Sequence, residues 1–163
     1  MRRRRVAFAV VVGLVIFGLM APGASAGKVD FRAPLSHAQE THSVNAPGAH
    51  GHAVFWVEGS TLHYRVSVKH LTGPATMAHI HAPGSRGTNA GVALWLCDSA
   101  AVPGPGATPA CSTVTSGSLI TGAVPVTAGQ LAWLRDGVGY VNVHTVAHPA
   151  GEVRGQILRL GRK

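Results

Sequence analysis

The stretch GHAVFWVE-GS-TLHYRVSV, residues 51–68, decides the fold class of this chain. Its first half is rich in aromatic and β-branched residues, and Gly59-Ser60 supplies a turn between the two halves. Its second half alternates apolar and polar residues with the period of a β-strand. Four apolar side chains share one face of that strand: Leu62, Tyr64, Val66 and Val68. The stretch therefore predicts a β-hairpin with one buried face.

Further strands are predicted on both sides of this hairpin. Short runs of strand-forming residues, separated by turns that contain Gly or Pro, lie at 29–35, 77–81, 91–97, 118–123, 139–145 and 153–160. Only residues 127–135 favour a helix, because Thr127 suits an N-cap and the leucines that follow have helical spacing. The pattern predicts an all-β domain, a Greek-key β-sandwich or barrel of about seven or eight short strands with one short helix.

The N-terminus has the three-part pattern of a secretory signal peptide. Four arginines at 2–5 precede an uncharged apolar run at 6–20, and Ala24-Ser25-Ala26 supplies the small residues of a cleavage site. The apolar run is shorter than the roughly 20 residues that a membrane-spanning helix needs. We therefore expect residues 1–26 to direct export by a Sec or twin-arginine route, and to be the only membrane-contacting segment. Residues 27–163 are expected to form one secreted or extracytoplasmic domain.

The part of the chain after the predicted signal carries a small positive charge. Ten of the 14 Lys and Arg residues lie there together with all six acidic residues, which gives a net charge of +4. The basic residues are scattered and do not alternate with aromatic ones, which argues against a nucleic-acid partner. The six acids are scattered as well, and no phosphate-binding glycine loop is present, so neither glycoside hydrolysis nor nucleotide chemistry is predicted.

Two cysteines, Cys97 and Cys111, lie in the part that is expected to be exported. Such a pair usually forms a disulfide in an oxidising compartment. A metal-thiolate pair is the alternative, although the thiolates of closed zinc sites are usually separated by only about two to four residues. We predict a disulfide that closes the loop 98–110, which is rich in Gly, Pro and Ala.

Ten histidines are the most informative feature for function. His79 and His81 are two residues apart in a predicted strand, so their imidazoles point to the same side. His144 lies in the predicted strand 139–145 and can join them if the two strands are neighbours. Neutral imidazoles suit copper and zinc. The three histidines are therefore a candidate metal site.

Other residues are secondary candidates for the same site. His148, in the turn before Pro149, is a candidate fourth ligand. Backbone carbonyls or carboxylates would orient the imidazoles, and Glu152 and Asp98 are the nearest acidic residues in sequence. The segment around His42 could cover the site.

Other interpretations of the histidine trio stay open at this point. Histidines on a strand can hydrogen-bond backbone carbonyls and act only as a structural cluster. They can also line a polar cleft for an organic ligand or respond to pH.

Three segments give the chain a resemblance to a known family. FRAPLSHAQE at 31–40, LTGPATMAHIH at 71–81 and YVNVHTVAHPAGEVRGQI at 140–157 resemble, in the same order, segments of the CHRD domain, the module named after chordin. The resemblance covers nearly all of the expected mature chain. It implies an all-β exported domain, found singly in bacterial proteins and repeatedly in chordin, and it implies no defined activity.

A second resemblance is confined to the histidines. The H-x-H of residues 79–81 and the VNVH of residues 141–144 are similar to the copper half of Cu,Zn superoxide dismutase. This likeness implies copper ligation by His79, His81 and His144. The bridging histidine and the zinc ligands of the dismutase would lie between the two motifs, but residues 82–143 contain no histidine.

These observations lead to a first hypothesis with two alternatives. The first is an exported CHRD-type protein that binds copper or zinc through the three histidines and handles the metal without turnover. The alternatives are a module that binds an extracellular protein or cell-surface component, with structural histidines, and a redox enzyme of the superoxide dismutase type. Arg154 is interpreted as an outward-facing strand residue, with contact to an anion as the alternative.

Overall fold

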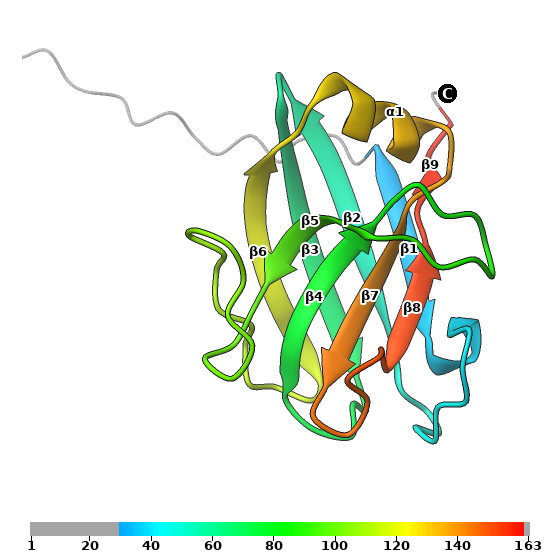
Figure 1. Ribbon diagram of the computed structural model, residues 1–163, viewed down its shortest axis with the longest axis vertical. Helices are drawn as coiled ribbons and strands as arrows, with labels where there is room; N and C mark the ends of the chain where they lie inside the picture. The colour runs from blue at the N-terminus through cyan, green and yellow to red at the C-terminus, as the bar shows by residue number, and fades with distance from the viewer. Residues whose placement is uncertain (1–29, 162–163) are drawn as a thin grey trace, which may run out of the picture.

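The computed structural model describes residues 30–161, which form a nearly closed, barrel-like sheet of antiparallel strands with one short helix (Figure 1). The predicted signal segment, residues 1–26, lies outside the described residues. In the part of the chain that is described, no helix is both long and apolar enough to cross a membrane.

Residues 30–161 form nine strands, one short 3-10 helix (η1) and one α-helix. In chain order they are β1 (Phe31–Ser36), η1 (His37–Gln39), β2 (His50–Glu58), β3 (Thr61–Lys69), β4 (Ala75–His81), β5 (Val92–Cys97), β6 (Gly117–Pro125), α1 (Ala128–Arg135), β7 (Tyr140–Thr145), β8 (Val153–Gln156) and β9 (Leu158–Arg159).

The order of the strands in the sheet is not their order in the chain. Neighbouring strands run β5-β4-β7-β8-β1-β2-β3-β6, and β9 pairs with β1. The connections from β3 to β4 and from β6 to β7 therefore pass from one part of the sheet to another, as Greek-key connections do. The prediction of an all-β Greek-key domain with one short helix is confirmed. The order also places β4 beside β7, two strands whose nearest ends, His81 and Tyr140, lie 59 residues apart in the chain.

The hairpin predicted from residues 51–68 is β2 and β3. The two strands pair in continuous register from His50 opposite Lys69 to Glu58 opposite Thr61. The four apolar side chains that alternate along β3 are all buried, as predicted, because they face the interior of the barrel. The hydroxyl of Tyr64 also donates a hydrogen bond of 2.8 Å to the carbonyl of Leu96, so it links β5, at one end of the sheet, to β3, the strand next to the other end.

The predicted helix is α1, and its beginning matches the sequence pattern. Thr127 accepts a hydrogen bond from the backbone of Gln130, whose side chain in turn accepts one from the backbone of Thr127. This reciprocal capping box satisfies N–H groups that the first helical turn leaves free. Leu131 and Leu134 face the core.

The last predicted strand, at 153–160, is two strands in the structure. The backbone N–H of Ile157 donates to the carbonyl of Gly139, and the Ile157 side chain is fully buried. This break separates β8, which pairs mainly with β7, from β9, which pairs with the opposite end of β1. The residue pattern is continuous through the break, so it carried no sign of the change of partner.

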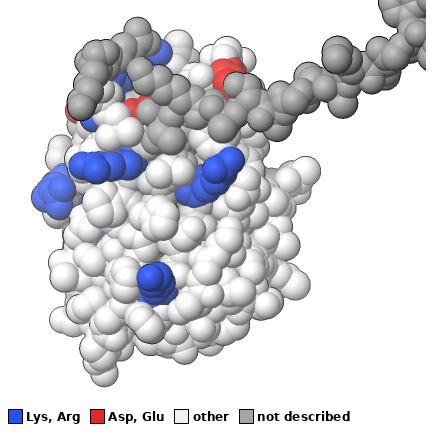
Figure 2. All heavy atoms as spheres, turned by 180° about the vertical axis from the view of Figure 1, so that it is seen from behind, with Lys and Arg blue, Asp and Glu red and all other residues white. Residues whose placement is uncertain are grey.

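The surface seen in Figure 2 is mostly uncharged. A few Lys and Arg side chains are scattered over it, together with fewer acidic ones. On this face the described residues do not form the basic stripe that nucleic-acid binding uses.

Cys97 and Cys111 form the predicted disulfide, 14 residues apart in sequence. The bond joins the end of β5 to the far end of the loop 98–110. Gly104 of this loop packs so closely on the Trp95 ring that a Cβ atom would collide with it. The disulfide therefore holds a loop that covers Trp95.

We expect the variant in which both cysteines are replaced by serine to lose about 3 kcal/mol of unfolding free energy, because a loop of this length regains its freedom in the unfolded chain. Urea unfolding followed by tryptophan fluorescence measures the loss. Wild-type protein treated with a reductant should lose a similar amount. A variant as stable as the oxidised wild type would contradict the stabilising role of the bond.

Candidate metal centre

His79, His81 and His144 converge on one point of the molecule. His79 and His81 lie on β4 and His144 lies on the neighbouring β7. The ring centroids are 5.6 Å apart for His79 and His81, 5.1 Å for His79 and His144, and 6.3 Å for His81 and His144. One nitrogen from each ring lies within 4.8 Å of the other two, so one ion could contact all three. The sequence identified these residues, and the structure brings them together.

The pleat of the strands puts the histidines on the outer side of the sheet. Ala78, Ile80 and Val143 alternate with them and point into the core. The pairing of β4 with β5 is irregular on both sides of His79 and Ile80, and such bulges re-aim side chains. Although it lies on the outer side, His79 is only 3% exposed, because the Trp95 ring lies edge-on at 4.2 Å.

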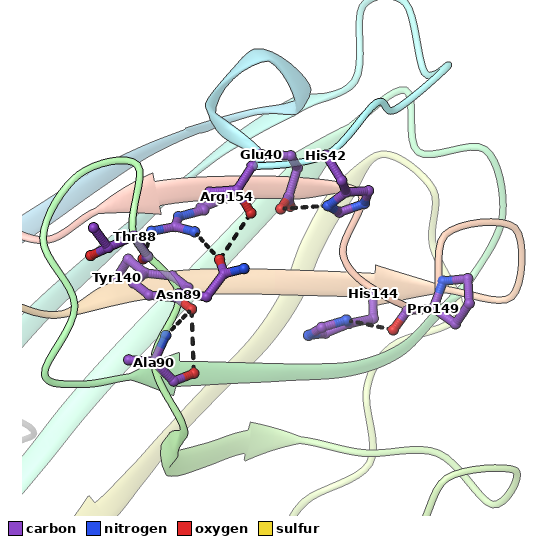
Figure 3. Close-up of polar contacts among 10 residues, drawn as sticks. Glu40, His42, Thr88, Asn89, Ala90, Tyr140, His144, Pro149 and Arg154 are labelled. Atoms are coloured by element: carbon purple, nitrogen blue, oxygen red, sulfur yellow. Dashed lines mark hydrogen bonds and ion pairs between the residues drawn. The ribbon is translucent and has the colours of Figure 1, made fainter.

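Backbone carbonyls orient two of the three imidazoles. Nδ1 of His81 lies 2.9 Å from the carbonyl oxygen of Ala90. Nδ1 of His144 lies 3.0 Å from the carbonyl oxygen of Pro149, as Figure 3 shows. A carbonyl only accepts hydrogen bonds, so both Nδ1 atoms carry the proton and both Nε2 atoms present a lone pair. Those Nε2 atoms, and both nitrogens of His79, are buried without a hydrogen-bond partner.

The two acidic residues considered for this orienting role bind elsewhere. Glu152 accepts hydrogen bonds from Thr72 and Thr145, and Asp98 accepts one from the backbone of Gly104. The carbonyl alternative is the one that the structure uses. The carboxylates were chosen for closeness in sequence, which does not report the direction of a side chain in a sheet.

Burial keeps the three imidazoles uncharged. It lowers the pKa of His79 to about 3 and that of His144 to about 4, and the neighbouring histidines add to the lowering. Burial also lowers the pKa of His81. Neutral imidazole is the form that ligates a metal, so the three rings could hold an ion at neutral pH.

The other histidines do not join the trio. His148 lies outside the group of converging nitrogens, and its backbone N–H donates to Thr145 in the turn after β7. His50 packs near His70, with ring centroids 5.9 Å apart, and His63 stacks on Trp56. His42 is closer to the site, because it lines the same cavity as His81 and His144.

A cavity of about 350 Å³ opens beside the trio and contains residues that the sequence did not single out. Its lining includes His81, His144, Glu40, His42, Tyr140 and Asn142. Glu40 follows η1, and its side chain is only 2% exposed. Burial raises the pKa of Glu40 to about 7, while Arg154 and Asn142 act in the opposite direction. An acidic residue in a polar loop has no periodic pattern around it, so no local feature of the sequence identified Glu40 as a buried residue of the site.

Gly151 makes the close packing around Glu40 possible. Its φ angle is +128°, and a Cβ atom there would lie 2.5 Å from Oδ1 of Asn142 and 2.7 Å from Oε1 of Glu40. Only glycine accepts both the conformation and the contact. The residue thereby lets the turn before β8 reach the carboxyl group.

Arg154 is the clearest departure from expectation. It faces the outer side of β8, as interpreted, yet it is only 2% exposed because a loop lies over it. Its guanidinium lies 3.5 Å from the centroid of the Tyr140 ring, and that ring stacks on His81. It donates to the carbonyl oxygen of Thr88 and to Oδ1 of Asn89, at 2.6 and 2.9 Å (Figure 3). The loop contacts that bury it come from distant sequence.

The chain also matches a known protein family. A family model of the CHRD domain matches residues 31–157, which include the whole trio and the cavity residues. No curated protein and no solved structure matches the chain.

Proposed function

Because this chain belongs to the CHRD domain family, we propose that it is an exported domain that binds one copper or zinc ion through His79, His81 and His144 and handles the metal without turnover. CHRD domains are typically extracellular, and the disulfide fits an oxidising compartment. The observation that carries the proposal is the set of three neutral imidazoles whose free nitrogens face one point.

The unpartnered nitrogens favour a metal over a purely structural cluster. Buried polar atoms normally have a hydrogen-bond partner, and leaving one without a partner costs about 1–3 kcal/mol. Here His79 has two such nitrogens, and His81 and His144 have one each. A metal ion would accept one lone pair from each ring.

The donor set favours copper or zinc among the metals. Imidazole nitrogen suits both ions, whereas Ca²⁺ and Mg²⁺ require oxygen ligands. Both cysteines are held in the disulfide, so no thiolate competes for the ion among the described residues. Three protein ligands also leave a coordination position open.

Interaction with an extracellular protein or cell-surface component is the second candidate function. The observation that favours it is the family itself, whose domains are extracellular interaction modules. The dismutase-type redox alternative rests only on the histidine spacing, and the chain has no histidine at 82–143 to bridge two metals. Metal handling accounts for the buried trio, which an interaction surface leaves unexplained.

Titration of the tag-free protein with Cu(II) is expected to show saturable binding of one equivalent. The fluorescence of Trp95 should be quenched, because its ring lies 4.2 Å from that of His79, and a d–d band should rise in parallel. A Trp95→Phe variant assigns the quenching. His144→Ala should weaken the affinity at least tenfold, since it removes one of three ligands.

His50→Ala is the matched control, because it removes an exposed imidazole on β2 outside the trio. It should leave the affinity unchanged. Equal losses from His144→Ala and His50→Ala would indicate nonspecific coordination by surface histidines and would contradict the proposal.

A further inference from the structure

The cavity beside the trio gives the metal position an entrance. His81 and His144 both line it, and the free nitrogen of each is Nε2. His79 does not line it and closes the site from the side of Trp95. In Figure 3 Glu40 and His42 lie across from the His144 ring, on the segment that covers this part of the sheet. An ion held by the trio would thus have its open position toward the cavity.

The charge next to the cavity is positive and is not neutralised by a direct partner. Arg154 is buried, and the acceptors of its hydrogen bonds are uncharged oxygens of Ser85, Thr88 and Asn89. The described residues contain two ion pairs, His42 with Glu40 and His63 with Glu58, and Arg154 takes part in neither. A buried cation without a carboxylate in contact is costly to maintain, and it attracts an anion.

The field of Arg154 reaches the groups around the cavity. The guanidinium lies 3.5 Å from the centroid of the Tyr140 ring, and that ring stacks on His81 with the centroids 4.8 Å apart. The charge of Arg154 also opposes the rise in the pKa of Glu40. Glu40 is the only acidic residue that lines the cavity. A bound divalent ion would add a second positive charge beside the same space.

We propose that this cavity admits a small anion that ligates the metal at its open position and is drawn there by the buried guanidinium of Arg154. The inference rests on the proposed metal site. It assigns the site a class of ligand: a small anion with an oxygen or nitrogen donor. It also assigns Arg154 the role of a positioning residue for that ligand.

The test uses the full chain loaded with one equivalent of Cu(II), with azide as the anionic probe and imidazole as a neutral one. Azide should produce a saturable ligand-to-metal charge-transfer band. Arg154→Met should weaken the affinity for azide roughly tenfold and leave the affinity for imidazole unchanged. A tenfold change is the order that one unit charge several ångströms away produces at an intermediate dielectric. Arg65→Met is the matched control, because it removes an equal charge from the exposed side of β3.

Glu40→Gln is a second variant, and it tests the proposal even if Arg154→Met fails to fold. At pH 8, above the pKa of about 7, it removes a negative charge from the cavity wall, so azide should bind several times more tightly. Circular dichroism checks that each variant is folded.

The outcomes separate the two proposals. Absence of saturable Cu(II) binding would reject the metal site itself. Bound copper that gives no azide band would overturn the anion inference alone. The anion inference would also be overturned if Arg154→Met and Arg65→Met had equal effects, or if Glu40→Gln left the azide affinity unchanged.

Discussion

His79→Leu is expected to weaken Cu(II) binding at least a hundredfold and, in the same protein, to raise the stability of the metal-free domain. The loss of affinity follows because the substitution removes the most buried of the three ligands. Altering a residue that only hydrogen-bonds to a ligand typically costs roughly 10–100-fold, and removing the ligand itself is a larger change. The gain in stability follows because both nitrogens of His79 are buried without partners beside an apolar ring. Removing them should stabilise the fold by about 1–2 kcal/mol at pH 7.

The difference between wild type and His79→Leu should grow as the pH falls. The pKa of His79 is about 3 in the folded protein against an ordinary value of 6.5, so below pH 6.5 the unfolded chain takes up a proton that the folded one does not. Above pH 6.5 the ring is neutral in both states, so it adds no pH dependence to the free energy of unfolding. As the pH falls from 6.5 toward 3, protonation of the unfolded chain alone lowers that free energy. The wild type then loses up to about 1.4 kcal/mol per pH unit through this group. The gap should be about 2 kcal/mol wider at pH 5 than at pH 7.

Urea unfolding of the metal-free proteins at both pH values measures this difference. His148→Leu is the control, because His148 lies in a turn outside the trio. A structural histidine that organises the core would behave in the opposite way, with His79→Leu less stable at every pH. That result would favour the structural interpretation of the cluster.

Gly155→Ala is expected to cost about 3–5 kcal/mol of unfolding free energy, the range of the most damaging single substitutions. Gly155 lies on β8 where this strand passes β1, and a Cβ atom there would collide with the carbonyl oxygen of Pro34. It would also lie 2.8 Å from Cδ2 of Leu35. The first obstacle is backbone inside a sheet, so relief requires the two strands to separate. Urea or thermal unfolding followed by circular dichroism measures the loss.

Gly73→Ala is the matched control. A Cβ atom at Gly73 would meet nothing within 4 Å, and its φ is not in the left-handed region. Its stability should therefore change by no more than about 0.5 kcal/mol. Equal effects of the two substitutions would show that β1 and β8 tolerate the added methyl group.

Much of the fold followed from local patterns. The alternation of residues 61–68 identified both the hairpin and its buried face, because a strand with one face in the core must alternate. The helix at α1 followed from the Thr127 cap and two leucines. The end of the chain was less predictable. The break at Ile157 depends on a hydrogen bond to Gly139, a partner 18 residues away.

The candidate site divides in the same way. The spacing of His79 and His81 defines their common side within a single strand, and a resemblance between motifs pointed to His144. His148 was a reasonable candidate from its position in the chain, but the group of converging nitrogens consists of His79, His81 and His144 without it. Glu40 was not a candidate, and Arg154 was interpreted only as an outward-facing strand residue or an anion contact. The burial of both side chains could not be predicted, because segments from distant parts of the chain cover them.

Residue types and their periodicity along the chain were enough to predict the all-β class, the disulfide pair and the three candidate ligands, and the resemblance of three segments to a known family indicated the CHRD domain. Three further properties came from the folded arrangement alone: β4 lies beside β7, carbonyls orient two of the imidazoles, and a cavity adjoins the trio, with the buried Arg154 in contact with its lining residues Asn89 and Tyr140. The reason is physical: strand neighbours, burial and the electric field at a point depend on which distant segments meet in space, and local sequence does not contain that information.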